Sequence, residues 1–147
     1  MCYQLPAILD EVITFVVSPL RSLILDQTQK LLSLGILCAA LTGDRTSGEV
    51  SSIYAQCYSP DCELKLIFIT PEKIEQSDQL NKLFSYLYTN NRLARFVIDE
   101  AHCISDWGKF KITFFFKINW LFEGHDFRPD YVKIGKWKDN FFLDKFN

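Results

Sequence analysis

Two adjacent carboxylates and a histidine follow an apolar run in this chain, and these residue types can take part in phosphate chemistry. Residues 93–108 read LARFVIDEAHCISDWG and contain the pair Asp99 and Glu100. The apolar part predicts a buried parallel strand, and acids at its carboxyl end would lie where open α/β sheets bind ligands. We interpret this segment as the acidic half of a nucleotide-hydrolysing site.

Phosphoryl transfer from ATP to water explains why two neighbouring acids are useful. One carboxylate can hold hydrated Mg²⁺, while the other positions or deprotonates the attacking water. We assign the metal role, through water, to Asp99 and the water role to Glu100. His102 is close enough in sequence to pass the state of the site to the turn at Trp107. The alternative is a capped, solvated strand end, because a bare DEAH tetrapeptide also arises by chance.

A second pattern places a hydroxyl residue and a proline after each of two other apolar runs. Ser18 is followed by proline, and Thr70 is also followed by proline. After Ser18 comes a stretch that ends at Gly35 and has apolar residues at helical spacing, namely Leu20, Leu23, Ile24, Leu31 and Leu34. Each pattern predicts a helix N-terminus whose amides can hold a phosphate, and Arg21 adds charge to the first. Two such ends can grip one nucleic-acid strand without reading its bases. The alternative is two ordinary helix caps.

These motifs resemble those of the RecQ family of superfamily 2 helicases, most closely its Bloom-syndrome-type branch. The similarity is almost continuous over residues 2–108 and resumes at His125. The matching segments, in family order, are CYQLPA at 2–7, VSPLRSL at 17–23, LTGD at 41–44, ITPEK at 69–73, DEAH at 99–102 and HDFRPDY at 125–131. Six ordered matches exclude coincidence as a serious explanation.

The resemblance implies a RecA-like P-loop NTPase domain from a nuclear, ATP-dependent 3′ to 5′ DNA helicase that acts in recombination and repair. ATP and Mg²⁺ would be its cofactors, with Asp99 and Glu100 facing them. Its partners would be single-stranded or forked DNA, and a full-length helicase or repair proteins. The residues that the resemblance assigns to nucleic-acid binding are Ser18, Arg21, Ser22, Thr42, Gly43, Thr70, Trp107, Phe127 and Arg128.

The order of predicted elements agrees with this fold. The patterns predict a short N-terminal helix, a strand to residue 17, a helix to 34, a strand at 38–41, a helix at about 48–58, a strand at 64–69, a helix at about 78–90 and the DEAH strand. Alternating strands and helices favour an α/β fold with a parallel sheet covered on both faces. A chain of 147 residues suits one domain.

Three departures from the family pattern affect the expected activity. The glycine-rich phosphate loop of the family would precede Cys2, where this chain begins with Met1. Residues 109–124, KFKITFFFKINWLFEG, separate segments 93–108 and 125–131, which are continuous in the family. We interpret residues 109–124 as a retained intron or a genuine insertion. Residues 132–147 match poorly. We therefore expect residues 1–147 to be a catalytically incompetent part of the first motor domain, or alternatively a non-catalytic single-strand-binding or interfering fragment.

Composition limits the remaining function classes. The net charge of −2 and the pI of about 5.7 provide no general basic field, so DNA contacts must come from local groups. Five cysteines lack paired metal-ligand spacing, and Cys57 and Cys62 without a nearby histidine make a poor zinc site. We expect reduced, structural thiols. No uncharged apolar run reaches membrane-spanning length, so we expect no membrane partner.

Overall fold

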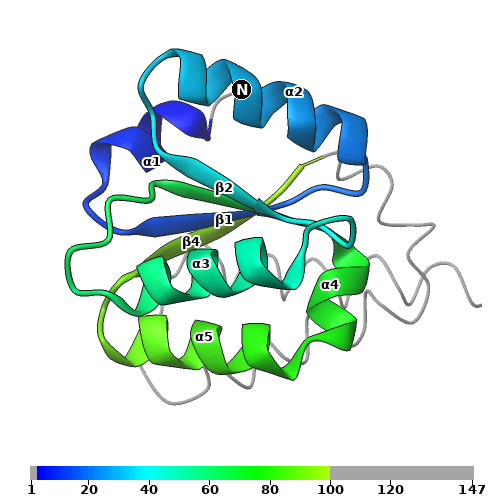
Figure 1. Ribbon diagram of the computed structural model, residues 1–147. Coiled ribbons are helices and arrows are strands. Elements are labelled where there is room, and N and C mark those ends of the chain that lie inside the picture. The colour runs from blue at the N-terminus through cyan, green and yellow to red at the C-terminus, as the bar shows by residue number, and fades with distance from the viewer. Residues whose placement is uncertain (1–2, 100–147) are drawn as a thin grey trace, which may run out of the picture. The chain divides into compact units, whose positions relative to one another are not determined.

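The computed structural model describes residues 3–99, which form a four-stranded parallel sheet with helices on both faces (Figure 1). In chain order the elements are α1 (Gln4–Leu9), β1 (Ile13–Val17), α2 (Arg21–Ser33), β2 (Cys38–Leu41), α3 (Ser47–Tyr58), β3 (Leu66–Ile69), α4 (Pro71–Gln76), α5 (Asp78–Thr89) and β4 (Leu93–Ile98). The predicted alternation and the α/β fold class are confirmed. Among these residues, none of the helices combines the length and apolarity that crossing a bilayer requires.

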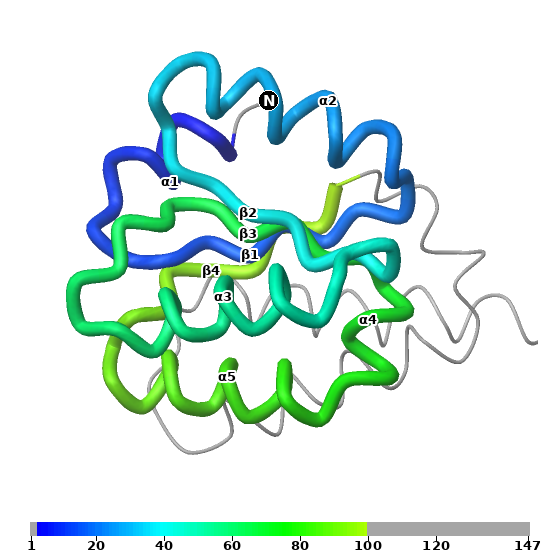
Figure 2. The backbone as a smooth tube through the Cα atoms, viewed as in Figure 1, coloured from blue at the N-terminus to red at the C-terminus, as the bar shows by residue number. Residues whose placement is uncertain are grey.

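The sheet has the strand order β2-β3-β1-β4, and all neighbouring strands are parallel. β1 lies between β3 and β4, and all five of its residues are buried. Figure 2 shows α1 and α2 on one face of the sheet and α3 and α5 on the other. Because both faces are covered, β1 is apolar on both sides, as parallel strands usually are. Val17 pairs with both Ile69 and Ile98, which brings the carboxyl ends of three strands level.

The prediction that β4 is buried is wrong, because all six of its residues are only partly buried. β4 pairs with β1 along one side, and no strand within residues 3–99 pairs with its other side. Its packing comes from α5, where the ring of Phe84 contacts both Phe15 of β1 and Phe96 of β4. The ring centroids are 4.8 Å apart for Phe15 and Phe84, and 4.9 Å apart for Phe84 and Phe96.

Two helices end in the same hydrogen-bonded turn before the next strand begins. After α2, Gly35 has φ +76°, and the N–H of Ile36 donates to the carbonyl of Leu31. After α5, Asn91 takes a φ of +54°, and the N–H of Arg92 donates to the carbonyl of Leu87. This Schellman arrangement favours glycine or asparagine at the left-handed position. The predicted helix stop at Gly35 is confirmed.

The prediction that Ser18 caps α2 is wrong. The helix begins at Arg21, its N-cap is Leu20, and no side chain caps it. Ser18 instead directly follows β1, and its N–H donates to the carbonyl of Ile69 over 3.0 Å. Proline disfavours helical backbone at the residue before it, so Pro19 keeps Ser18 out of the helix. Helix α4 does begin as predicted, with Thr70 at its N-cap, although the Thr70 hydroxyl makes no capping hydrogen bond.

The aromatic contacts predict how much α5 contributes to stability. Replacing Phe84, which is 4% exposed, with alanine should lower the free energy of unfolding by about 3–5 kcal/mol, and leucine by about 1 kcal/mol. Urea denaturation of the 147-residue chain measures both. Leu32→Ala, at a position 48% exposed on α2, is the control and should change stability by less than about 0.5 kcal/mol. Equal losses at Phe84 and Leu32 would contradict the packing described here.

Candidate functional site

Four polar side chains from three elements meet at the carboxyl end of β4. Asp99 follows the strand, and its Oδ2 accepts hydrogen bonds from Gln27 Nε2 at 3.1 Å and from the Tyr3 hydroxyl at 3.5 Å. The Tyr3 hydroxyl also lies within hydrogen-bond distance of Gln27 Oε1, to which Gln4 Nε2 donates at 3.4 Å. We call Tyr3, Gln4, Gln27 and Asp99 the Asp99 cluster. It connects the start of α1, the middle of α2 and the end of β4.

Backbone geometry places each member of the cluster. The N–H of Asp99 donates to the carbonyl of Val17 over 2.9 Å, so the carboxylate follows the last residue of β4 at the sheet edge. Tyr3 is the N-cap residue of α1. Gln27 belongs to the buried face of α2, where it is 6% exposed. A buried amide needs hydrogen-bond partners, and the cluster supplies them.

The environment of Tyr3 keeps its hydroxyl protonated. Burial, followed by the negative charge of Asp99, raises the pKa of Tyr3 to about 12 from an ordinary value of 10.0. At neutral pH Tyr3 is therefore a neutral hydrogen-bond donor to the cluster. Together with Gln27, it provides donors that orient one oxygen of the Asp99 carboxylate.

The donor set fits a hydrated magnesium ion. Mg²⁺ prefers hard oxygen ligands, keeps several of its waters and is usually held by one or two carboxylates. Asp99 offers such a carboxylate at the strand end beside the start of α1. Within residues 3–99 no group of three or more histidine, cysteine, aspartate or glutamate side chains could hold a metal by protein ligands alone.

Sequence reasoning identified Asp99 but missed Tyr3 and Gln27. Of the apolar residues that it placed on one face of this helix, Ile24 and Leu31 are buried as predicted, whereas Leu20 and Leu34 are 49% and 66% exposed. The buried face of α2 consists of Ile24, Gln27, Thr28 and Leu31. A glutamine at the same helical spacing as buried aliphatic residues was the available signal, because such a group requires a partner.

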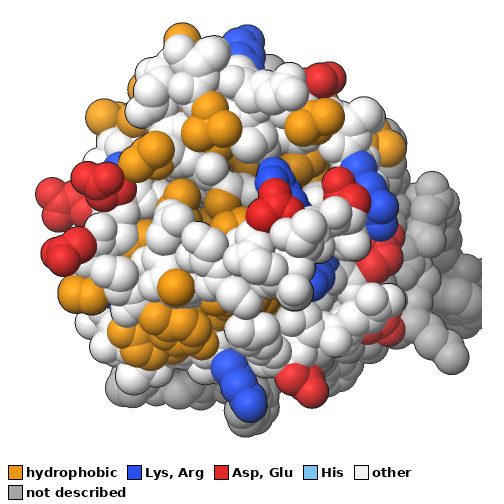
Figure 3. All heavy atoms as spheres, in the orientation of Figure 1, with side chains coloured by type: hydrophobic (Ala, Val, Ile, Leu, Met, Phe, Trp, Pro, Cys, Tyr) orange, Lys and Arg blue, Asp and Glu red, His pale blue; other side chains and the backbone are white. Residues whose placement is uncertain are grey.

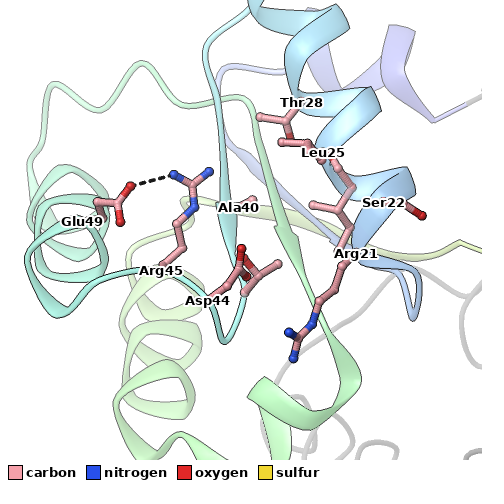
Figure 4. A pocket seen from close by; sticks show the side chains of 10 residues that line it. Arg21, Ser22, Leu25, Thr28, Ala40, Asp44, Arg45 and Glu49 are labelled. Atoms are coloured by element: carbon pink, nitrogen blue, oxygen red, sulfur yellow. Dashed lines mark hydrogen bonds and ion pairs between the residues drawn. The ribbon is translucent and has the colours of Figure 1, made fainter.

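A pocket of about 410 Å³ opens at the carboxyl end of β2 (Figure 4). Arg21 and Ser22, in the first turn of α2, form one wall, and Arg45 and Glu49, at the start of α3, form another. The turn that follows β2 contributes Thr42 and Asp44. The other lining residues are Ile24, Leu25, Thr28 and Ala40.

Charges in this pocket are paired across short distances. Arg45 Nη1 lies 3.0 Å from Glu49 Oε1, and Glu49 also accepts from the backbone N–H of Thr46 at 2.8 Å. The Thr46 backbone N–H is the main cause that lowers the pKa of Glu49. The pKa of Asp44 is lowered as well, and the largest cause is the hydrogen bond with the Thr42 hydroxyl. The Asp44 backbone amide and the charges of Arg21 and Arg45 lower it further. Both acids therefore remain ionised at neutral pH.

The guanidinium of Arg21 lies over the turn after β2. A Cβ built on Gly43 would be 3.3 Å from Arg21 Nη2, which is tighter than most real contacts. Glycine at this position therefore lets the arginine approach the backbone closely. Two residues that the sequence assigned to nucleic-acid binding from separate motifs, Arg21 and Gly43, are thus neighbours.

The structure separates the predicted nucleic-acid contacts by exposure. Arg21 and Ser22 are exposed at the pocket, and Gly43 is exposed in the turn after β2. The other three that fall within the described residues are buried, with Ser18 at 1%, Thr42 at 6% and Thr70 at 2% exposure. Lying outside residues 3–99 are Glu100, His102, Trp107, Phe127, Arg128 and the predicted insertion at 109–124.

The pocket and the Asp99 cluster are separate sites on one sheet edge. β2 and β4 are the outer strands of the order β2-β3-β1-β4, so three strand spacings, about 14 Å, separate them. On the face shown in Figure 3, basic and acidic side chains are interspersed and form no continuous basic stripe. Attraction of a polyanion to this face would therefore depend on individual arginines.

Comparison with known proteins gives consistent results. Residues 1–121 match the family described as DEAD/DEAH box helicase. The chain is 46% identical over 141 residues to the RecQ-like DNA helicase BLM of Xenopus laevis, which covers 96% of this chain and 9% of that protein. It is 41% identical to the ATP-dependent DNA helicase Q-like 4B of Arabidopsis thaliana and 37% identical to the ATP-dependent DNA helicase Q1 of Pongo abelii. The alignments cover 96% of this chain, and 11% and 19% of those relatives.

The Asp99 cluster predicts a stability effect that distinguishes two glutamines of one helix. Gln27→Leu leaves the Asp99 carboxylate and the Tyr3 hydroxyl without their amide partner and should destabilise the chain by about 1–3 kcal/mol. The exposed Gln29 provides the matched control, and Gln29→Leu should change stability by less than about 0.5 kcal/mol. Urea unfolding curves measure both. A neutral Gln27→Leu substitution would show that the cluster adds no stability.

Proposed function

Because the chain belongs to the DEAD/DEAH box helicase family, we propose that it forms part of an ATP-dependent DNA helicase of the RecQ type. The chain spans between 9% and 19% of the length of the relatives compared above, so the activity belongs to a longer protein. The observation that carries the proposal is the placement of Asp99 at the carboxyl end of β4, beside the start of α1.

In this proposal, Asp99 holds Mg²⁺ through water. The Gln27 and Tyr3 donors fix the orientation of its carboxylate, so the carboxylate is already oriented before the ion binds. Glu100 positions the attacking water, and His102 communicates with the turn at Trp107. Bound Mg²⁺ would neutralise charge on the phosphates of ATP. In the RecQ family, a glycine-rich loop that ends in Gly-Lys-Ser or Gly-Lys-Thr binds those phosphates. Residues 1–147 contain neither of these tripeptides.

The pocket beside β2 is the proposed contact for single-stranded DNA. Arg21 and Ser22 offer an exposed guanidinium and hydroxyl at the beginning of α2, and Gly43 lets the guanidinium approach the backbone. Such groups bind phosphates and carry no base specificity. Thr42, Ser18 and Thr70 are buried and would instead shape the turns that present these contacts. Trp107, Phe127 and Arg128 would add stacking surfaces.

By analogy with the RecQ family, we propose 3′ to 5′ translocation on single-stranded or forked DNA, a role in recombination and repair, and a nuclear location. The second candidate function is a non-catalytic fragment that binds single-stranded DNA or interferes with a full-length helicase. The accessible Arg21 pocket favours this candidate for a polypeptide of these 147 residues.

The first prediction of this proposal concerns DNA binding by the 147-residue chain. Arg21→Ala should weaken binding to a labelled single-stranded oligonucleotide about threefold to fivefold, as expected for one exposed charge contact. It should also reduce the slope of log affinity against log salt by about 0.7. Fluorescence anisotropy across a salt series measures both quantities.

Lys30→Ala is the matched control, because Lys30 is an exposed cation in the last turn of the same helix. It should leave both affinity and salt slope nearly unchanged. Equal losses for the two variants would indicate general charge attraction rather than a contact at the pocket. Absence of binding by the unaltered chain would contradict the single-strand-binding candidate for this polypeptide.

A second prediction concerns the longer protein that contains these residues. Glu100→Gln should lower DNA-stimulated ATP hydrolysis by about 100-fold or more while ATP binding persists, since it removes the group that positions the water. Steady-state phosphate release and nucleotide binding measure the two effects. Glu75→Gln, at an exposed position on α4, is the control and should hydrolyse ATP normally. A Glu100→Gln protein with normal turnover would refute this role.

A further inference from the structure

Arg45 is a second cation at the pocket beside β2, and an ion pair with Glu49 holds its side chain. Arg45 Nη1 lies 3.0 Å from Glu49 Oε1, and the two side chains are 33% and 47% exposed. Exposed pairs at this i,i+4 spacing add little stability, because water screens both charges. Within residues 3–99 this is the one hydrogen bond of the Arg45 guanidinium. Arg45 therefore loses little free energy when it leaves Glu49 for another anion.

The position of Glu49 does not depend on Arg45. Glu49 Oε2 accepts hydrogen bonds from the backbone N–H and the hydroxyl of Thr46, both at 2.8 Å, and the Glu49 N–H donates to the Thr46 hydroxyl at 3.3 Å. These contacts form a capping box at the start of α3. Arg45 contacts the other carboxylate oxygen, Oε1. Departure of Arg45 would therefore leave the start of α3 intact.

The pocket contains a second arginine on its other wall. Arg21 comes from the first turn of α2, whereas Arg45 lies in the turn before α3 (Figure 4). The charges of both arginines act on Asp44, which lies in the turn after β2. Two arginines and the two acids Asp44 and Glu49 give the lining a formal charge of zero. A polyanion is therefore attracted to the pocket only weakly as long as Arg45 stays paired with Glu49.

We propose that Arg45 is a second phosphate-binding residue of this pocket, and that it exchanges Glu49 for a phosphodiester of the single strand that Arg21 contacts. The planar guanidinium suits this exchange, because its donors match two oxygens of a carboxylate or of a phosphate. Glu49 competes with the phosphate and so limits the affinity of the pocket. The inference rests on the proposed DNA contact at the pocket. Arg45 directly follows the LTGD segment at 41–44 and lies outside the six matching segments.

The test measures binding of the 147-residue chain to a labelled oligothymidylate by fluorescence anisotropy across a salt series. Arg45→Ala should weaken binding about threefold and reduce the slope of log affinity against log salt by about 0.7, the effect of one lost phosphate contact. Glu49→Gln should tighten binding about threefold, because the competing charge is removed while glutamine can keep the capping box.

Asp78→Asn is the matched control for Glu49→Gln. Asp78 is an exposed acid in the first turn of α5 and does not line the pocket. Its substitution removes the same charge at an equivalent helix position and should change the affinity less than about 1.5-fold. An equal gain from Asp78→Asn and Glu49→Gln would show a general charge effect and would overturn the inference.

The double variant isolates the exchange between the two anions. In the Arg45→Ala background, Glu49→Gln should change the affinity less than about 1.5-fold, because no arginine is left to release. A threefold gain in that background would mean that Glu49 repels DNA directly, and would overturn the inference. Loss of binding in Arg21→Ala with normal binding in Arg45→Ala would overturn the inference alone. Absence of binding by the unaltered chain and by every variant would overturn it together with the proposed DNA contact.

Discussion

The 2.9 Å hydrogen bond from the Asp99 N–H to the Val17 carbonyl is the contact on which the arrangement of the site depends. It ends the parallel pairing of β1 and β4, so the first acid of the DEAH segment emerges at the level of the sheet edge. On the other side of β1, the N–H of Ser18 donates to Ile69 in the same way. Because β1 is buried on both faces, it cannot shift register without exposing apolar side chains. The position of Asp99 is therefore a consequence of the core.

The Asp99 cluster extends this constraint from the sheet to two helices. Gln27 occupies a buried position on α2 where an aliphatic residue would pack well, and its amide connects Asp99 with the beginning of α1. A buried polar group that has its partners fixes one arrangement, because alternatives leave it unsatisfied. The arrangement of α1, α2 and β4 around the carboxylate thus rests on these hydrogen bonds together with the apolar core that contains Ala7, Ile24 and Leu31.

The sequence predicted local structure well where the local signal was strong. The apolar runs of β1 and β2 have the predicted boundaries, and Gly35 ends α2 because it provides the positive φ that its turn requires. The wrong or missing predictions concern features that depend on a partner distant in the sequence. β4 is only partly buried because, within residues 3–99, it pairs on one side, and its position in the sheet is not encoded in its own residues. Tyr3 and Gln27 were missed for the same reason, since Asp99 lies far from both in the chain.

The residues that the sequence assigned to nucleic-acid binding include both buried and exposed positions, although they belong to the same motifs. Ser18, Thr42 and Thr70 each follow a strand, and in each the backbone leaves the sheet while the side chain stays buried. Arg21, Ser22 and Gly43 come a few residues later or at the tip of a turn, where side chains and backbone reach the surface. A motif that spans both positions contains residues that build the turn and residues that face the solvent. Substitution of the first kind would act through stability, whereas substitution of the second kind would change the exposed surface without disturbing the fold.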